Sequence, residues 1–478
     1  MHQDQQNRLF QARIVASIAA TVMSLACGTN YVYSAWAPQF AERLKLSSTE
    51  SNLIGLCGNL GMYTLGMPIG AFIDSRGPRP AVLAGAVLML LGYFPLHQAY
   101  HRGSGSVILM CVFSYMTGLG SCMAFAASVK TSALNWPKTR GTATAFPLAA
   151  FGLSAFFFSF VGAVFFPGNP SAFLELLAWG TSGLTFGSFF FLKVYHDQPD
   201  YEAVPASDDT QSDPSSSSSQ QFRPGSSEEP KPFRSSRVDN EPDIRGLALL
   251  RSASFWHLFI IMGILAGVGL MTINNIGNDA KALWKHYDKN VTDDTLVHRQ
   301  QMHVSALSIC SFLGRLSSGV GSDFLVNKLH ASRLWCLVAA CIIFIFAQVC
   351  ALNVENPHWL GLVSGPSGLA YGFLFGVSPS LVAETFGVGG LSQNWGFITM
   401  APVFSSNIFN IFYGKIYDAH SVVGKDGELS CLDGLQCYRS AYWVTLLSCC
   451  AGTGITLWAI RHRHAKHQRA MNKGHEED

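Results

Sequence analysis

Charged residues are scarce in this chain of 478 residues. Asp, Glu, Lys and Arg make up 13% of it, about half of the roughly 25% found in an average soluble domain. Hydrophobic residues make up 49%. A water-soluble protein is therefore disfavoured, and the net charge of only +2 argues against a nucleic-acid partner.

Motifs that would indicate an enzyme are missing as well. The sequence has no G-x-x-x-x-G-K-[ST] loop for ATP. Its cysteines and histidines lack the spacing of a metal site, and no His, Asp or Cys constellation suits catalysis at a membrane interface. We therefore expect no enzymatic activity, no metal and no cofactor.

Long apolar runs dominate what is present. A helix of about 20 residues, rising 1.5 Å per residue, crosses the roughly 30 Å hydrocarbon core of a bilayer. The sequence predicts an all-α membrane protein with twelve transmembrane helices in two six-helix pseudo-repeats. The expected spans are residues 14–36, 52–73, 81–99, 105–128, 143–166, 172–194, 254–276, 302–322, 333–352, 359–382, 395–417 and 439–460.

This pattern divides the chain into four regions. Residues 1–195 are expected to form an N-terminal six-helix bundle, and residues 247–462 a C-terminal one. Between them, residues 196–246 are rich in Ser, Pro, Asp, Glu and Lys, a composition that buries too little apolar surface to fold. We expect a disordered cytoplasmic linker there and a basic cytoplasmic tail at residues 463–478.

The distribution of basic residues predicts the orientation. An even number of spans puts both termini on one side of the membrane. If that side is the cytoplasm, the termini and the loops beside them hold roughly 21 of the 32 Lys and Arg residues, the bias that the positive-inside rule describes. We expect a multi-pass protein with cytoplasmic termini, in either the plasma membrane or the vacuolar membrane.

Two loops on the other side carry features of an oxidising, secretory compartment. The sequence "NVT" makes Asn290 a candidate for glycosylation. Cys431 and Cys437 flank "LDGLQ" between the last two spans, where a disulfide is permitted and a pair of free thiols is the alternative. The other ten cysteines fall in spans and are expected to be small packing residues.

An internal repeat relates the two sixes. Span two ends in "LGMPIGAFIDSRG" and span eight in "LGRLSSGVGSDFL", so that a glycine precedes an aspartate by four residues in each. The pairs are Gly70 with Asp74 and Gly319 with Asp323. Parallel repeats of this kind are a transporter architecture, with the ligand site between the halves near the middle of the membrane.

The motif around the first pair resembles a known family. Gly70, Asp74, Arg76, Gly77 and Arg79 resemble the loop between spans two and three of the major facilitator superfamily. Within it, "LNWPKTRGTATAFPLAAFGLSAFFFS" and "NWGFITMAPVFSSNIFNIFYGKIYDAH" resemble the fungal nodulin-like facilitators, which are related to the monocarboxylate porters. The resemblance implies a twelve-span carrier that works by alternating access.

The same loop is expected to act as a gate. Gly70 lets two helices approach closely, Asp74 at a helix end suits a cation or a helix N-terminus, and Gly77 permits a tight turn. The resemblance implies that the loop stabilises the state closed on the cytoplasmic side; alternatively, its arginines only set the orientation. The remaining gating candidates are Arg140, Gly319, Asp323 and Glu384.

Arg315 is the main candidate for substrate binding. It lies in span eight, roughly 10 to 12 Å from the cytoplasmic end at 1.5 Å per residue. A permanently charged guanidinium there favours an anion, and its fork of donors fits a carboxylate. The monocarboxylate porters carry a similar arginine in this span, although their preceding acidic residue is replaced by Ser311 here. The alternative is a structural bond to a carbonyl or carboxylate of the other half.

Several uncharged polar residues in spans are weaker candidates. Tyr33 is preferred to Tyr31 because it lies three residues from Asn30 and so shares its helix face. Hydrogen bonding between helices is an equally good explanation for each. The full set of uncharged candidates is Asn30, Tyr33, Asn274, Asn275, Tyr371 and Asn407.

Together these features predict a secondary active transporter for a small solute, in particular an organic anion such as a monocarboxylate. A proton is the candidate coupling ion, although Glu175 and Asp279 lie too near the outer ends of their spans to serve as a clear mid-span carboxylate. The alternatives are a nutrient sensor built on a transporter fold and a facilitator of an uncharged solute. We expect a monomer in the lipid bilayer.

Overall fold

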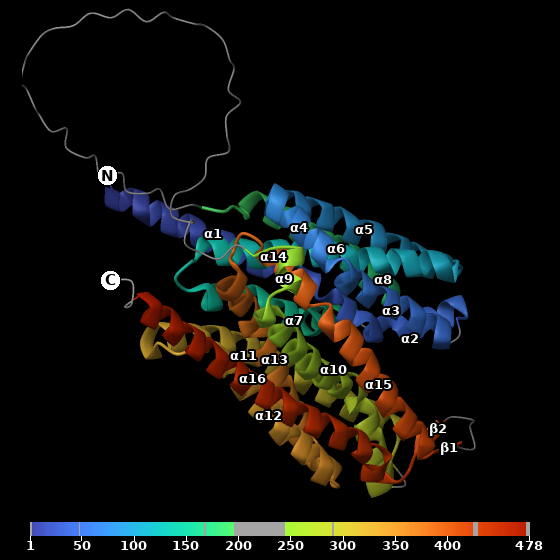
Figure 1. Ribbon diagram of the computed structural model, residues 1–478. Helices are drawn as coiled ribbons and strands as arrows, with labels where there is room; N and C mark the ends of the chain where they lie inside the picture. Colours follow the sequence, from blue (N-terminus) through green and yellow to red (C-terminus); the bar gives the residue numbers. More distant parts are fainter. Residues whose placement is uncertain are drawn as a thin grey trace, which may run out of the picture.

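The computed structural model describes residues 2–46, 48–166, 169–195, 244–288, 291–423 and 429–474. Within these ranges the chain is almost entirely helical (Figure 1). Most of the predicted linker, residues 196–243, and the predicted glycosylation site Asn290 lie outside the described residues.

The N-terminal half contains eight α-helices and one short 3-10 helix, η1. Its elements are α1 (His2–Cys27), η1 (Thr29–Val32), α2 (Tyr33–Leu44), α3 (Ser48–Thr64), α4 (Gly66–Arg76), α5 (Pro78–Arg102), α6 (Val107–Asn135), α7 (Arg140–Phe165) and α8 (Pro170–Phe191).

The C-terminal half follows the same plan and adds a small hairpin. Its elements are α9 (Leu247–Leu250), α10 (Ala253–Tyr287), α11 (Asp293–Leu329), α12 (Leu334–Asn353), η2 (Pro357–Trp359), α13 (Gly361–Phe386), α14 (Leu391–Ile398), α15 (Ala401–Ala419), β1 (Ser421–Val423), β2 (Leu429–Cys431), η3 (Gly434–Cys437) and α16 (Arg439–Gly474). Strands β1 and β2 pair antiparallel, a small departure from the all-helical prediction within the described residues.

Nine helices in the described part of the chain are long and apolar enough to cross a membrane, and α3 with α4, bent by 43°, makes a tenth span. Helix α8 and the pair α14 and α15 occupy the predicted sixth and eleventh positions. Three predicted spans are thus broken helices: the first at η1, the second at Leu65 and the eleventh at Thr399 and Met400. A break frees backbone groups that neighbouring helices must satisfy.

The turn between α4 and α5 follows from its sequence. Gly77 has a φ of +84°, a region that glycine enters without a steric penalty. Pro78 then opens α5, at a position where its missing N–H would have had no helical partner.

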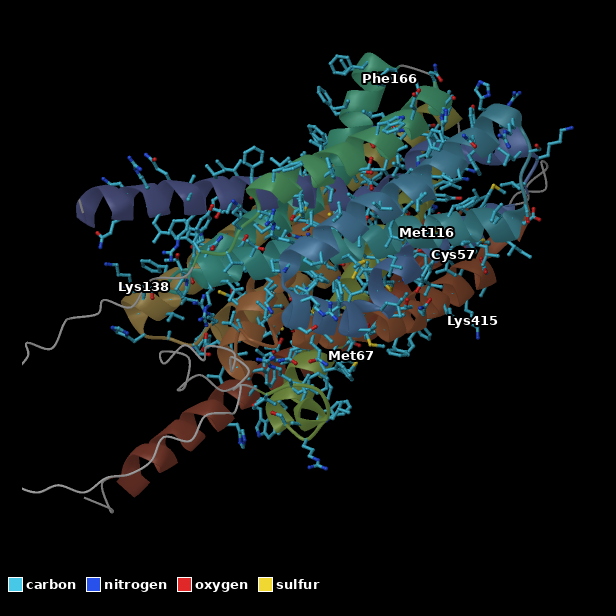
Figure 2. All side chains as sticks on the ribbon, turned by 90° about the horizontal axis from the view of Figure 1, so that it is seen from above. Cys57, Met67, Met116, Lys138, Phe166 and Lys415 are labelled. Atoms are coloured by element: carbon cyan, nitrogen blue, oxygen red, sulfur yellow. A yellow bond between two sulfur atoms is a disulfide. The ribbon has the colours of Figure 1, made fainter. Side chains whose placement is uncertain are left out.

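The two halves lie side by side as bundles that diverge along their length (Figure 1). Helix α1 begins and α16 ends at the same end of the molecule, which we call the terminal face; the other end is the opposite face (Figure 1). Lys138 lies at the terminal face and Lys415 near the opposite face (Figure 2). The halves meet where α7 packs on α11 and α4 packs on α14.

The outside of the bundle is apolar. Large hydrophobic side chains are strongly exposed there, including Ile108, Phe165 and Leu447. Such a surface would cause aggregation in water but suits contact with lipid. The described residues thus have the surface of a membrane protein.

Candidate functional site

A cavity lies between the two halves. Arg315 and Tyr371 line it from the C-terminal half, and Tyr31, Tyr63 and Phe151 line it from the N-terminal half. About 40 Å³ of it is open to the centre of a water molecule, enough for a few waters at roughly 10–15 Å³ each. The enclosed volume is therefore small, although Tyr31 of the lining is 39% exposed.

Arg315 is the charged residue of this cavity lining. It projects from α11 and is only 5% exposed. One guanidinium nitrogen, Nη1, donates to the carbonyl oxygen of Leu148 on α7 at 2.7 Å, whereas Nε has no hydrogen-bond partner among the described residues. The guanidinium carbon lies 5.7 Å and 5.5 Å from the ring centres of Phe151 and Phe375. The charge is thus held by one carbonyl and two aromatic faces, and no carboxylate of the described chain pairs with it.

Three tyrosines from three elements share the cavity with Arg315. Tyr31 comes from η1, Tyr63 from α3 and Tyr371 from α13. The hydroxyls of Tyr31 and Tyr63 are hydrogen-bonded to each other. Phenolic O–H groups can donate to an anion, so the cavity combines a fixed cation with neutral donors.

Asn30 and Tyr33 lie elsewhere. Both line a separate small cavity inside the N-terminal half. The Asn30 amide donates to the carbonyl of Gly58 at 3.3 Å and accepts from Thr117 at 3.0 Å, so it ties helices together. The structure therefore places Tyr31 beside Arg315, and the preference for Tyr33 is corrected. Asn30 and Tyr33 do share a helix face, as expected for residues three apart, but that face points into the N-terminal half and not toward Arg315.

The asparagines of the C-terminal half form a group apart from the cavity lining. Asn275 and Asn274 on α10 donate to the side-chain oxygen of Asn410 on α15, at 2.8 Å and 3.4 Å. Asn407 donates to the carbonyl of Val403 on its own helix at 2.6 Å. These amides join α10 to α15 or satisfy their own helices, and the structure does not bring them to Arg315.

Asp74 forms a contact between the halves at the terminal face. From the end of α4 it accepts hydrogen bonds from the backbone N–H groups of Ser392, at 3.3 Å, and Gln393, at 2.9 Å. These are early N–H groups of α14, which lack partners within that helix. Lys130 on α6 forms a buried ion pair with the same carboxylate and donates to the carbonyl of Gly389 at 3.2 Å.

Asp323 repeats this arrangement from the other half. From α11 it accepts from the backbone N–H groups of Gly141, at 3.1 Å, and Thr142, at 2.6 Å, in the first turn of α7. Arg333 pairs with it at 2.7 Å and with Glu384 at 3.0 Å. Each half thus offers an aspartate to a helix N-terminus of the other, where a negative charge is favoured.

Small residues make these contacts possible. A methyl group added at Gly70 would lie 2.2 Å from the carbonyl oxygen of Ser392, and one added at Gly319 would lie 2.3 Å from the Cβ of Ala145. Real Cβ contacts of this kind essentially do not occur. The backbones of α4 and α14, and of α11 and α7, therefore touch only because glycine stands at these positions.

The remaining gating candidates have other partners. Glu384 pairs with Arg333, and Arg140 opens the helix whose next N–H groups bind Asp323. Arg79 lies 4.6 Å from the ring centre of Phe189, and Arg76 is exposed at the end of α4.

Sequence reasoning missed Tyr63, Lys130 and Arg333. Lys130 lies two residues beyond the predicted end of the fourth span, but α6 continues to Asn135 and buries it, where a lysine needs a partner.

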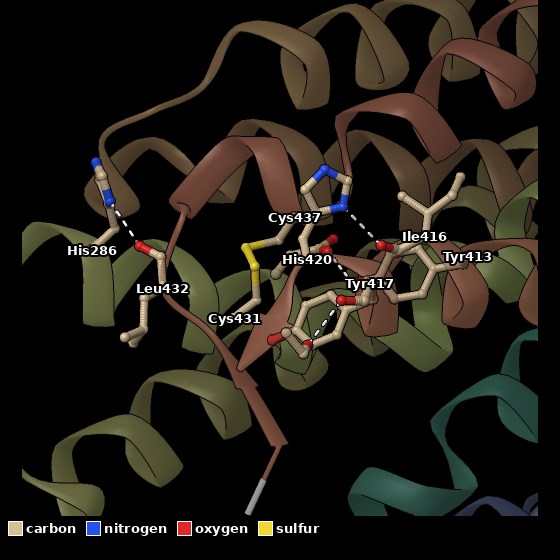
Figure 3. The surroundings of a disulfide bond; sticks show 10 residues. His286, Tyr413, Ile416, Tyr417, His420, Cys431, Leu432 and Cys437 are labelled. Atoms are coloured by element: carbon tan, nitrogen blue, oxygen red, sulfur yellow. Dashed lines mark hydrogen bonds between the residues drawn. A yellow bond between two sulfur atoms is a disulfide. The ribbon is translucent and has the colours of Figure 1, made fainter. Parts of the chain in front are cut away.

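At the opposite face, a disulfide joins Cys431 to Cys437 (Figure 3). His286 at the end of α10 shares a 2.9 Å hydrogen bond with the carbonyl of Leu432 between these cysteines (Figure 3). The loop between α15 and α16 is thereby fixed to α10.

No group of His, Cys, Asp and Glu suited to a metal ion is found among the described residues.

Comparison with known proteins explains this plan. The model of the Major Facilitator Superfamily matches residues 18–409. The chain belongs to this superfamily. Its members carry small molecules, so the protein is an integral membrane transporter. The superfamily fold has twelve membrane-spanning segments in two halves.

Relatives from yeast and a filamentous fungus match nearly the whole of this chain. An uncharacterized membrane protein of Saccharomyces cerevisiae, YMR155W, is 28% identical over 90% of this chain and 91% of its own. The "probable transporter MCH1" of Gibberella zeae is 25% identical over 98% of this chain and 93% of its own. The solved structure of FucP, a Major Facilitator Superfamily transporter in the outward conformation, matches this chain with a TM-score of 0.58 and 12% sequence identity. The match covers 92% of this chain and 99% of FucP. At this identity the likeness to FucP shows the fold alone.

Proposed function

We propose that this facilitator carries a small organic anion, such as a monocarboxylate, by alternating access, with Arg315 as the anion-binding group. The observation that carries the proposal is the guanidinium itself. It is buried between the halves, it faces a cavity, and within the described chain no carboxylate neutralises it. A buried charge without an ionic partner is costly, and a carboxylate substrate would supply that partner.

The surroundings of Arg315 suit one compact anion. The Nε hydrogen is unused among the described residues, and the tyrosine hydroxyls lie in the same cavity. Apolar and aromatic residues such as Phe125, Phe375 and Trp395 make up most of the remaining lining. The charged group of a small organic anion would therefore contact Arg315 and the tyrosine hydroxyls, and its apolar part would contact the aromatic lining.

The gating step follows from the contacts between halves. Asp74 and Asp323 each bind a helix N-terminus of the other half at the terminal face. Opening that face toward solution requires both sets of bonds to break, together with the bond from Arg315 to Leu148. Substrate binding at Arg315 would replace the last of these and so lower the cost of opening.

We further propose that the terminal face is cytoplasmic. Basic residues concentrate in the termini and in the loops on that side. The disulfide lies at the opposite face, where an oxidising compartment preserves it. The plasma membrane and the vacuolar membrane both satisfy these conditions.

Reconstitution tests the proposal. The full chain in proteoliposomes is given labelled pyruvate, lactate and acetate, with an uncharged polyol of similar size as the control. We expect saturable uptake of at least one anion and none of the polyol. A nutrient sensor would bind an anion in a thermal-shift assay without moving it, and uptake of the polyol alone would indicate a facilitator of uncharged solutes. Either result would overturn the proposed function.

A further inference from the structure

Asp279 is a carboxylate that the anion site does not use. The sequence placed it beyond the outer end of the seventh span, but α10 continues to Tyr287, so Asp279 is buried in the bundle, about 1% exposed, toward the opposite face. Its two oxygens each accept one hydrogen bond of 2.6 Å, from the hydroxyl of Tyr413 on α15 and from that of Tyr442 on α16. Among the described residues no cation pairs with it.

A purely structural role does not explain a carboxylate here. One turn earlier on α10, Asn275 joins α10 to α15 through Asn410 without any charge. An ionised group buried without a cation is disfavoured, so an amide would join α10, α15 and α16 at lower cost. The residue type therefore points to a group whose charge changes during function.

Both protonation states of Asp279 can be hydrogen-bonded in place. The ionised carboxylate accepts from both tyrosine hydroxyls, as in this structure. The protonated acid donates its O–H to one of these hydroxyls, since a phenol can turn and accept as well as donate. The two tyrosines therefore offer a proton site that needs no large rearrangement.

The other groups around Asp279 keep their charge near neutral pH. Tyr413 and Tyr417 face it from α15, Tyr438 from the residue between η3 and α16, and Tyr442 from the first turn of α16. Phenols ionise near pH 10. The guanidinium of Arg299 on α11 lies 5.0 Å from the ring centre of Trp284, which is five residues after Asp279 on α10. Among these side chains Asp279 is thus the carboxyl group that can exchange a proton, because the phenols do not ionise near neutral pH.

We propose that Asp279 binds and releases the proton that drives transport. A proton from solution adds to one carboxylate oxygen, and the same proton is released later in the transport cycle, so nothing is oxidised or reduced. Helix α10 connects this site to the anion site, because a Cβ at Gly269 would lie 2.5 Å from the ring of Tyr371. This inference rests on the proposed function.

The first test needs no substrate. Dicyclohexylcarbodiimide reacts with protonated carboxyl groups inside membranes, and peptide mass spectrometry locates the product. In the full chain in proteoliposomes we expect Asp279 to be modified at low pH, with the yield falling as the pH rises toward 8. Absence of modification at every pH would overturn the proton site, whatever the protein transports.

The second test measures coupling. With one proton per anion, an inward gradient of one pH unit supports about tenfold accumulation of labelled pyruvate or lactate. We expect Asp279→Asn to lose this stimulation and keep exchange of anion across the membrane, and Asp279→Glu to retain part of it. Thr445→Val is the matched control, because it removes a buried 2.6 Å bond from α16 to Gln348 without removing a titratable group.

The two tests separate failure of the proton site from failure of the anion site. Stimulation that survives in Asp279→Asn, or that is lost equally in Thr445→Val, would overturn the proposal. If the wild type takes up no anion, the proposed function fails, and carbodiimide modification still decides whether Asp279 binds a proton. If Asp279→Asn does not fold, Asp279→Glu and the modification of the wild type give the answer.

Discussion

At the scale of single residues, sequence pattern identified Arg315 but not its surroundings. A lone arginine in an apolar run is conspicuous, because a charge in a span must find a partner. Its neighbours Phe151 and Phe375 come from helices of different halves, so no local pattern could reveal them. Tyr31 was passed over because the sequence does not show which face of this segment meets the other half, and the face of Asn30 and Tyr33 turns away from it.

Arg315→Lys tests the geometry of the anion site at this scale. Lysine keeps the charge but loses the planar fork of donors, so we expect the apparent affinity for a monocarboxylate to fall about tenfold, or ~1.4 kcal/mol. The measurement is the concentration dependence of uptake, with Arg299→Lys as the control on the same helix. An unchanged affinity would argue that Arg315 has a structural role.

At the scale of elements, the fold depends on two helix pairs that cross between halves. The sequence repeat predicted that Gly70 with Asp74 and Gly319 with Asp323 are equivalent, and the structure places each aspartate at a helix N-terminus of the other half. The partner helices could not be predicted, because α14 and α7 lie far from these motifs in the sequence. The cations also differ, with Lys130 in one half and Arg333 in the other.

Gly70→Ala should weaken the pairing of α4 with α14. The added methyl group would lie 2.2 Å from the carbonyl oxygen of Ser392, so the helices must separate. We expect the closed state to lose about 1–3 kcal/mol, seen as a lower melting temperature in detergent. Gly183→Ala on α8 is the control, since nothing lies within 4 Å of its added methyl. Equal melting temperatures would mean that the two helices do not pack this closely.

Asp74→Asn and Asp323→Asn test the two aspartate contacts. An uncharged amide accepts fewer bonds and loses the ion pair, so each variant should open the terminal face more often. We expect faster labelling of a cysteine introduced at Ser392 and altered turnover, with anion affinity changed much less. Because the two contacts lie in different helix pairs, their effects should add. Turnover equal to that of the wild type in both variants would contradict a gating role.

At the scale of the whole molecule, composition alone indicated a helical membrane protein. The broken spans carried a sequence signal that was not used, because Pro68 and Pro402 lack the N–H that would bond to the carbonyls of Thr64 and Ile398, where the preceding helices end. The number of spans was predictable because length and apolarity are local properties. How the halves face each other was not, since it depends on contacts between distant segments.

Orientation is tested by two introduced cysteines. Lys138 is exposed at the terminal face, and Glu355 is exposed in the loop between α12 and α13. With cytoplasmic termini in a plasma membrane, a membrane-impermeant maleimide should label Glu355→Cys in intact cells and Lys138→Cys only after permeabilisation. The unsubstituted chain measures the background from native cysteines. The reverse pattern would show that the orientation is inverted.

The most direct test of the central claim is exchange of labelled monocarboxylate across proteoliposomes, compared among the wild type, Arg315→Ala and Arg299→Ala. We expect rapid exchange in the wild type and in Arg299→Ala, and at least a tenfold loss in Arg315→Ala, because only that variant removes the cation between the halves. Equal exchange in all three proteins would show that the anion does not bind at Arg315.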